Sequence, residues 1–193
     1  MKLSLRLLPI LLLGPVSVGL AATWEVDTQR SSLSFVSTKN VDIAEAHQFR
    51  AVTGTLDADG KFALVIDLKS VDTKIPIRDD RIAEHVFAGA EQATVSGAVD
   101  PAVLGDIGIG ESALVDLKGE LSFLGKTTPI LARTEVSASA GRLQAVTREP
   151  VLLNMRVLGA GTGIEKLREI AGLTSISMAV PVYFSISLRR AGD

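Results

Sequence analysis

Apolar and polar residues alternate along most of the chain from residue 23 onward, and the last long segment shows this best. In 175–188 every even position is apolar, whereas the odd positions hold serine, alanine, proline and tyrosine. A period of two is typical of a β-strand with one apolar face. The run exceeds an ordinary strand of about 5–6 residues, which favours a strand that curls along a barrel wall. Pro181 cannot donate a backbone hydrogen bond, so we expect a bend, a bulge or the barrel seam there.

The same alternation predicts further strands, and turn residues between some of them predict hairpins. Asp57 to Gly60 and the pair Gly125-Lys126 separate consecutive strands, as in antiparallel hairpins. The strands are expected at 23–26, 33–38, 52–56, 62–68, 94–99, 113–123, 128–138, 143–147 and 151–157.

Two stretches have helical spacing instead. In 77–87, Ile82 and Val86 share one side with Arg78, and charged residues surround the rest. In 164–171, apolar residues recur at helical spacing before Gly172. Both stretches predict short helices.

This number of strands, together with only two short helices, indicates an all-β, mainly antiparallel fold. We expect a closed eight-stranded barrel, because closure leaves no exposed sheet edge. A barrel of this size is either filled by side chains or holds one small ligand. The chain has only six Phe, one Trp and one Tyr, so we infer an unfilled, apolar-lined tunnel. The expected tunnel residues are Phe35, Phe49, Val115, Leu117, Phe123, Met178, Val180 and Phe184.

The N-terminus is typical of a secretory signal peptide. Lys2 and Arg6 precede an apolar stretch that Gly14 and Pro15 interrupt, and Ala21 and Ala22 follow it. The stretch is shorter than the roughly 20 residues of a membrane-spanning helix. We therefore expect a signal peptide at 1–22, one exported domain at 23–193, and no stable membrane insertion.

The amino-acid composition limits the kinds of site and partner that the chain can have. The chain has no Cys and two His, which leaves little for metal sites or thiol chemistry. The net charge of −2 is spread over interspersed acids and bases, which gives no electrostatic footprint for nucleic acid. We expect no metal, no cofactor and no nucleic-acid partner, and the sequence leaves a homodimer open.

Catalytic motifs are weak. The segment 119–127 has one residue too many between its glycines for a phosphate-binding loop, and it lies at a hairpin. His47, expected in a polar connection, and His85 lack the serine elbow of a hydrolytic triad. The cluster of Arg78, Asp79 and Arg81 is suited either to a salt-bridged helix surface, the favoured interpretation, or to a ligand headgroup.

Short motifs along the whole mature chain resemble the YceI-like family of bacterial periplasmic proteins. They are Ser70-Val71-Asp72-Thr73 with the following Arg78-Asp79, the block 119–130, and the opening Trp24-Glu25-Val26-Asp27. The resemblance implies an extended lipocalin-like barrel in the periplasm whose tunnel accepts a polyisoprenoid or quinone-like chain.

Three functions remain open on this basis. The first is a non-enzymatic carrier that buries an apolar chain. The second is an enzyme acting on a lipophilic substrate, with Arg78, Asp79 and His85 at its mouth. The third is a regulatory module with a filled barrel and a surface that recognises a partner protein.

Overall fold

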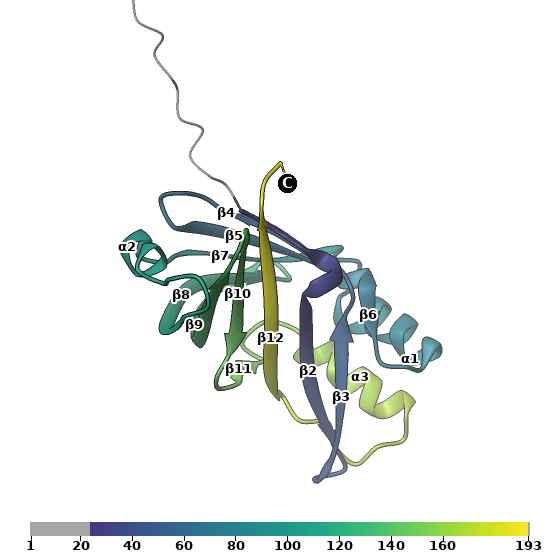
Figure 1. Ribbon diagram of the computed structural model, residues 1–193. Coiled ribbons are helices and arrows are strands. Elements are labelled where there is room, and N and C mark those ends of the chain that lie inside the picture. Colours follow the sequence, from purple (N-terminus) through teal and green to yellow (C-terminus); the bar gives the residue numbers. More distant parts are fainter. Residues whose placement is uncertain (1–23, 193) are drawn as a thin grey trace, which may run out of the picture.

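Antiparallel strands build most of the structure, a computed structural model that describes residues 24–192 (Figure 1). The predicted signal peptide lies outside the described residues. The strands are β1 (Trp24–Val26), β2 (Ser32–Lys39), β3 (Ile43–Phe49), β4 (Val52–Leu56), β5 (Lys61–Asp67), β6 (Val71–Asp72), β7 (Gln92–Ala98), β8 (Ser112–Phe123), β9 (Lys126–Ser139), β10 (Arg142–Thr147), β11 (Val151–Asn154) and β12 (Ala179–Arg190).

Pairing of the first and last strands closes the barrel. β1 pairs with both β4 and β12, which completes the ring β1-β4-β5-β7-β8-β9-β10-β12. The described residues thus confirm the predicted eight-stranded antiparallel barrel. The 3₁₀ turn η1 (Thr28–Arg30) separates β1 from β2, and β2, β3 and β6 extend the wall beyond the ring (Figure 1).

The predicted alternation sets the faces of the long strands. On β8 the odd residues are turned inward, and Val115, Leu121 and Phe123 are buried. On β12 the even residues are turned inward, and Ile186 and Leu188 are buried. A strand with one apolar face must present that face to the interior, so the sequence period determines the lining of the barrel.

β12 changes neighbours along its length. It pairs with β11 from Ala179 to Val182 and with β10 from Ser185 onward. Pro181 lies opposite Leu152 of β11, close to this change of partner, in agreement with the expected seam. The segment 175–178, predicted as the beginning of the same strand, lies ahead of β12.

Helices cover one side of the wall extension (Figure 1). The predicted helix at 77–87 is α1 (Pro76–Arg81), which continues as the π-helical turn η3 (Ile82–Val86). The predicted helix at 164–171 is α3 (Gly161–Ile170). A third helix, α2 (Pro101–Gly105), and the 3₁₀ turn η2 (Leu68–Ser70) were not expected. None of the helices within 24–192 is long and apolar enough to cross a membrane.

The close approach of α3 to η3 depends on a glycine. A Cβ atom on Gly163 would lie 2.0 Å from the backbone oxygen of His85, which is far inside van der Waals contact. The absence of a side chain therefore lets the two helical segments pack directly against each other beside the barrel interior.

One strand boundary and one unpredicted strand have local explanations. The strand predicted at 151–157 ends at Asn154, because its side-chain Oδ1 accepts hydrogen bonds from the backbone N–H groups of Arg156 and Val157 and forms a turn. β3 was not predicted, because two of its inward positions are the polar residues Glu45 and His47, which hide the apolar period.

Candidate functional site

A cavity of about 550 Å³ lies inside the barrel and its wall extension. Its size falls in the range of about 300–1,000 Å³ that is usual for small-molecule sites. Most strands of the barrel and of its wall extension contribute apolar side chains, and α1, η3 and α3 cover the remaining side. The interior is therefore not filled by its own side chains, which agrees with the predicted tunnel and argues against the filled-barrel hypothesis.

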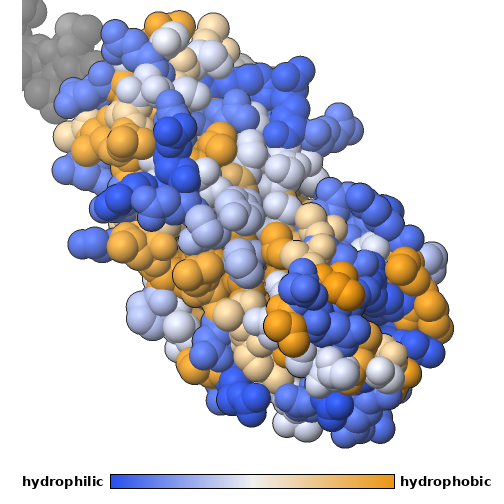
Figure 2. Space-filling model, turned by 90° about the horizontal axis from the view of Figure 1, so that it is seen from below, coloured by the Kyte–Doolittle hydropathy of each residue, from blue (hydrophilic) through white to orange (hydrophobic). Residues whose placement is uncertain are grey.

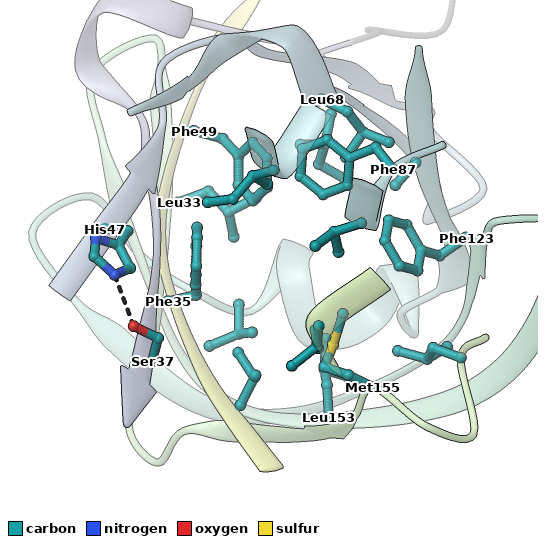
Figure 3. Close-up of a pocket in the computed structure, with 18 of the residues that line it drawn as sticks. Leu33, Phe35, Ser37, His47, Phe49, Leu68, Phe87, Phe123, Leu153 and Met155 are labelled. Carbon is teal, nitrogen blue, oxygen red and sulfur yellow. Dashed lines mark hydrogen bonds between the residues drawn. The ribbon is translucent and has the colours of Figure 1, made fainter. Parts of the chain in front are cut away.

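A row of aromatic rings follows the cavity wall (Figure 3). The ring centroids of Phe35 and Phe49 are 5.4 Å apart, those of Phe49 and Phe87 are 6.1 Å apart, and those of Phe87 and Phe123 are also 6.1 Å apart. Leu153 and Met155 lie across the central space from this row (Figure 3). The rings line the space without closing it, so an apolar guest can contact them on several sides.

The structure brings together most of the predicted tunnel residues. Leu117 lines a smaller second cavity, whereas Val115 and Met178 line neither cavity. Val115 instead packs in the buried core, opposite Thr134 of β9. The predicted residues that line the main cavity are Phe35, Phe49, Phe123, Val180 and Phe184. Their part in ligand binding stays a prediction.

The sequence reasoning missed lining residues from the helices and from β3. Ile82, Val86, Ile164 and Leu167 all line the cavity, and their helical spacing had already placed them on common faces. The helical spacing is therefore a sequence signal that could have identified these residues as part of the cavity lining. Phe87 follows η3 and has no periodic signal of its own.

Polar lining residues gather at one end of the cavity. Ser37 and Lys39 are the last inward residues of β2, and Glu45 and His47 are the first polar ones of β3. Arg78, Arg81 and Ser177 complete the set. The wall therefore changes from phenylalanine through neutral polar residues to charged residues along the same two strands.

The same end of the cavity is open. Ile75 and Ile77 line the cavity, yet they are 45% and 56% exposed. Lining residues toward the other end, such as Leu121 and Ile186, are buried. Viewed from below, Figure 2 shows apolar side chains among polar ones where the β2–β3 hairpin reaches this end. We call this end, marked by Lys39, Glu45, Ile75, Ile77 and Arg78, the mouth.

His47 lies inside the cavity wall and not in a polar connection, which corrects the sequence expectation. It is only 5% exposed, and its Nε2 atom shares a hydrogen bond of 2.8 Å with Ser37 Oγ (Figure 3). Burial, followed by the positive charge of Arg78, lowers the pKa of His47 below 6.5. The imidazole is therefore neutral at neutral pH.

Ser37 and His47 form a hydrogen-bonded serine–histidine pair, but among the described residues no carboxylate completes a triad with them. In Ser-His-Asp enzymes a carboxylate accepts from the second ring nitrogen and holds the imidazole in place. His47 Nδ1 is buried and has no hydrogen-bond partner among the described residues. The pair therefore has no group that orients the base. His85 lies 3.8 Å from Glu84 on η3 and is not a cavity-lining residue.

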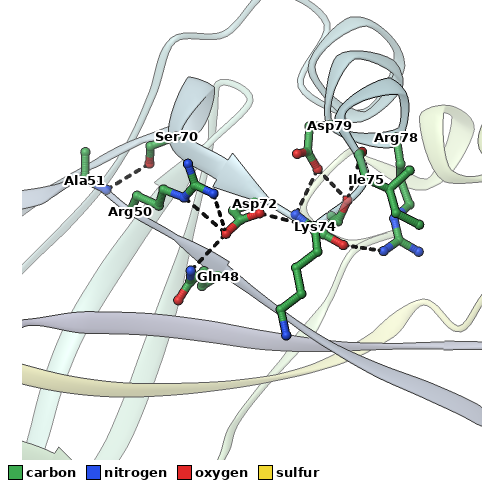
Figure 4. Close-up of polar contacts among 10 residues, drawn as sticks. Gln48, Arg50, Ala51, Ser70, Asp72, Lys74, Ile75, Arg78 and Asp79 are labelled. Atoms are coloured by element: carbon green, nitrogen blue, oxygen red, sulfur yellow. Dashed lines mark hydrogen bonds and ion pairs between the residues drawn. The ribbon is translucent and has the colours of Figure 1, made fainter.

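Of the predicted headgroup residues, Arg78 and Arg81 line the cavity and Asp79 does not. The Asp79 carboxylate accepts from both the backbone N–H and the hydroxyl of Thr73, at 2.9 and 2.5 Å (Figure 4). Arg78 Nη2 donates to the Thr73 carbonyl at 2.6 Å. Asp79 thus holds α1 against Thr73, which follows β6, and of the three predicted headgroup residues only the two arginines are placed to contact a guest.

The Ser70–Thr73 motif has a structural role beside the mouth. Asp72 accepts hydrogen bonds from Gln48, from the backbone N–H of Lys74 and from Arg50 (Figure 4). These hydrogen bonds lower the pKa of Asp72 to about 2. The motif therefore fixes the junction between β3, β6 and α1. Within 24–192 no cluster of His, Asp or Glu is arranged to hold a metal ion.

Comparisons with known proteins agree with this architecture. No sequence among curated proteins matches the chain. A solved polyisoprenoid binding domain from Saccharophagus degradans, described as implicated in plant cell wall breakdown, is 33% identical with a TM-score of 0.83, and the match covers 86% of this chain and 98% of that one. Burkholderia cenocepacia BcnA, at 20% identity, shares the fold with a TM-score of 0.64 over 84% of this chain and 98% of that one.

The family model described as YceI-like domain matches residues 24–188, which is nearly the whole described barrel. The motifs at 70–73 and 78–79, which carried the resemblance in the sequence, lie within this match and form the junction at the mouth. The chain belongs to the YceI-like family.

Proposed function

We propose that the chain is a carrier of the periplasm that holds one long apolar molecule, of polyisoprenoid or quinone-like type, inside its barrel. The observation that carries the proposal is the cavity of about 550 Å³, which is apolar except at its mouth. Burial of an apolar chain there contributes about 0.8 kcal/mol per methylene group removed from water. The relative from Saccharophagus degradans, described as a polyisoprenoid binding domain, supports the same class of guest.

The distribution of charge supports one orientation of the guest. Among the charged residues that line the cavity, Lys39, Arg78 and Arg81 are basic and only Glu45 is acidic. Amino and guanidinium groups donate hydrogen bonds to oxygen acceptors. We therefore place an oxygen-bearing headgroup at the mouth and the hydrocarbon chain along the phenylalanine row.

A carrier fits the site better than an enzyme acting on a lipophilic substrate. The Ser37–His47 pair lies in the cavity, but within the described residues no acid contacts His47 Nδ1. A hydrolase depends on that contact to keep the imidazole in the catalytic tautomer. Neither the family description nor that of the relative at 33% identity names a reaction.

Native mass spectrometry of protein purified without detergent tests the carrier function. We expect a reproducible adduct with the mass of a prenyl lipid on the wild type. Val182→Trp inserts a bulky ring into the cavity and should lose the adduct, whereas Tyr183→Trp, at the adjacent outward position, should retain it. A wild type that stays free of ligand after incubation with prenyl alcohols and ubiquinone overturns the proposal.

Export needs a separate experiment. Expression of the full chain followed by osmotic shock should release a protein that lacks residues 1–22, as intact mass will show. Recovery of the full-length chain in the cytoplasmic fraction contradicts the periplasmic assignment without affecting the binding result.

A further inference from the structure

A second, smaller cavity of about 90 Å³ adjoins the main one on the side away from the mouth. The two cavities share five lining residues, so a single layer of side chains separates them. Phe184 is the only aromatic residue in that layer, and it lines both cavities. The shared residues are Leu64, Val95, Ile130, Phe184 and Ile186.

Two paired glycines create a recess in the wall of the second cavity. Gly97 on β7 lies opposite Gly119 on β8, and Phe62 on β5 lies opposite Gly97. A Cβ atom on Gly97 would be 2.6 Å from Phe62 Cζ, and one on Gly119 would be 3.4 Å from it. The Phe62 ring thus occupies the space that two side chains would take. With a side chain at Gly97 the ring would have to move.

The far side of the second cavity is apolar and packed. Leu56, Val99, Leu143 and Leu188 line it and are each at most 9% exposed. Leu104 of α2 also contributes to the lining. A cavity with such a lining is the kind that stays dry and accepts an apolar group.

We propose that the second cavity is a subsite for the apolar terminal unit of the bound chain, and that Phe184 is the gate to it. This rests on the proposed carrier function. A chain that enters from the mouth reaches the Phe184 layer last, and rotation of the ring joins the two cavities into one longer tunnel. Phe184 and the second cavity then set the length of the prenyl chain that the barrel prefers.

The test compares two Phe→Leu variants that remove the same volume. Phe184→Leu opens the layer between the cavities, whereas Phe123→Leu enlarges only the main cavity. Each protein is offered an equimolar mixture of farnesol, geranylgeraniol and solanesol, and native mass spectrometry reports which alcohol is retained. Phe184→Leu should raise the ratio of the longer to the shorter retained alcohol by at least about tenfold, because additional methylenes become buried. Phe123→Leu enlarges the main cavity but leaves the layer closed, so it should change that ratio much less than Phe184→Leu does.

A variant that fills the second cavity should have the opposite effect on the preferred chain length. Leu117 lines the second cavity only, so Leu117→Phe should reduce retention of the longest alcohol that the wild type holds and leave shorter ones bound. Circular dichroism checks that each variant is folded, and if Leu117→Phe is not, Phe184→Leu decides alone. Variants that bind prenyl alcohols with the wild-type length preference overturn the gate and leave the carrier function intact. A wild type that binds none of the alcohols overturns both.

Discussion

Arg78 on α1 donates a hydrogen bond of 2.8 Å from Nη1 to Glu45 Oε2 on β3, and so joins a helix to the barrel wall at the mouth of the cavity. Lys39 on β2 pairs with the same carboxylate at 2.8 Å. The hydrogen bond from Lys39, followed by the positive charges of Arg78 and Lys39, lowers the pKa of Glu45. One acidic side chain therefore holds the three elements that surround the opening.

Loss of Arg78 should loosen the mouth. Arg78→Ala removes the hydrogen bonds to Glu45 and to the Thr73 carbonyl, and we expect a loss of about 1–2 kcal/mol in the free energy of unfolding and faster release of a bound prenyl lipid. Urea denaturation and the off-rate of a fluorescent prenyl analogue measure the two effects.

The matched control is Lys69→Ala. Lys69 and Glu91 form an ion pair whose side chains are 66% and 69% exposed, and neither residue lines the cavity. Because exposed pairs contribute little, stability and release should stay close to the wild type. Equal effects of the two substitutions would contradict a specific role for Arg78.

Asp72 should make the fold resistant to acid. Its pKa is lowered from 3.8 to about 2 by hydrogen bonds, so its stabilising contribution is complete above about pH 4 and is lost as the pH falls toward 2. Asp72→Asn should lower the free energy of unfolding at pH 6, and the difference from the wild type should vanish near pH 2. Urea denaturation at several pH values measures this, with Asp106→Asn on an exposed turn as the control. A difference that is independent of pH would contradict the assignment.

His47 should give a pH dependence of the same sign, but at a higher pH than Asp72. Its folded pKa lies below 6.5, so in moderately acidic solution the unfolded chain binds a proton that the folded protein does not. The free energy of unfolding should therefore decrease as the pH falls below about 6.5, and His47→Gln should reduce this slope. His85→Gln should keep the slope, because His47 is unchanged in it. Denaturant titrations between neutral and mildly acidic pH decide between these outcomes.

Gly163 should be essential for the packing of α3. Gly163→Ala places a Cβ 2.0 Å from the His85 carbonyl oxygen, and we expect a loss of about 1–3 kcal/mol because backbone must move. Gly105→Ala, at the end of α2 with no atom within 4 Å of the added Cβ, is the control and should be neutral or slightly stabilising. A thermal unfolding midpoint for Gly163→Ala equal to that of the wild type would show that α3 can shift without cost.

Sequence patterns predicted those strands and helices in which the apolar residues form one distinct face. The alternation in 113–123 and in most of 175–188 placed Phe123, Val180 and Phe184 on the cavity side. The helical spacing grouped Ile82 with Val86 and, separately, Ile164 with Leu167, and the structure shows that both faces line the cavity, to which the sequence had not assigned them. β3 was not predicted because Glu45 and His47 occupy inward positions. A sequence pattern assigns polar residues to the solvent-facing side of a strand, so these two residues interrupt the expected apolar face.

By itself the sequence determined the antiparallel barrel and the side of each long strand that faces inward, because an apolar period of two must be buried. It also supplied the motifs that resemble the YceI-like family. Only the tertiary structure decided which inward residues surround empty space and which, like Val115, pack in the core. It also decided that Asp79 positions a helix, that Glu45 joins three elements at the mouth, and that Phe62 rests on Gly97 and Gly119. These relationships depend on distances between strands and helices that are far apart in the chain. The local pattern of apolar and polar residues carries no information about such distances.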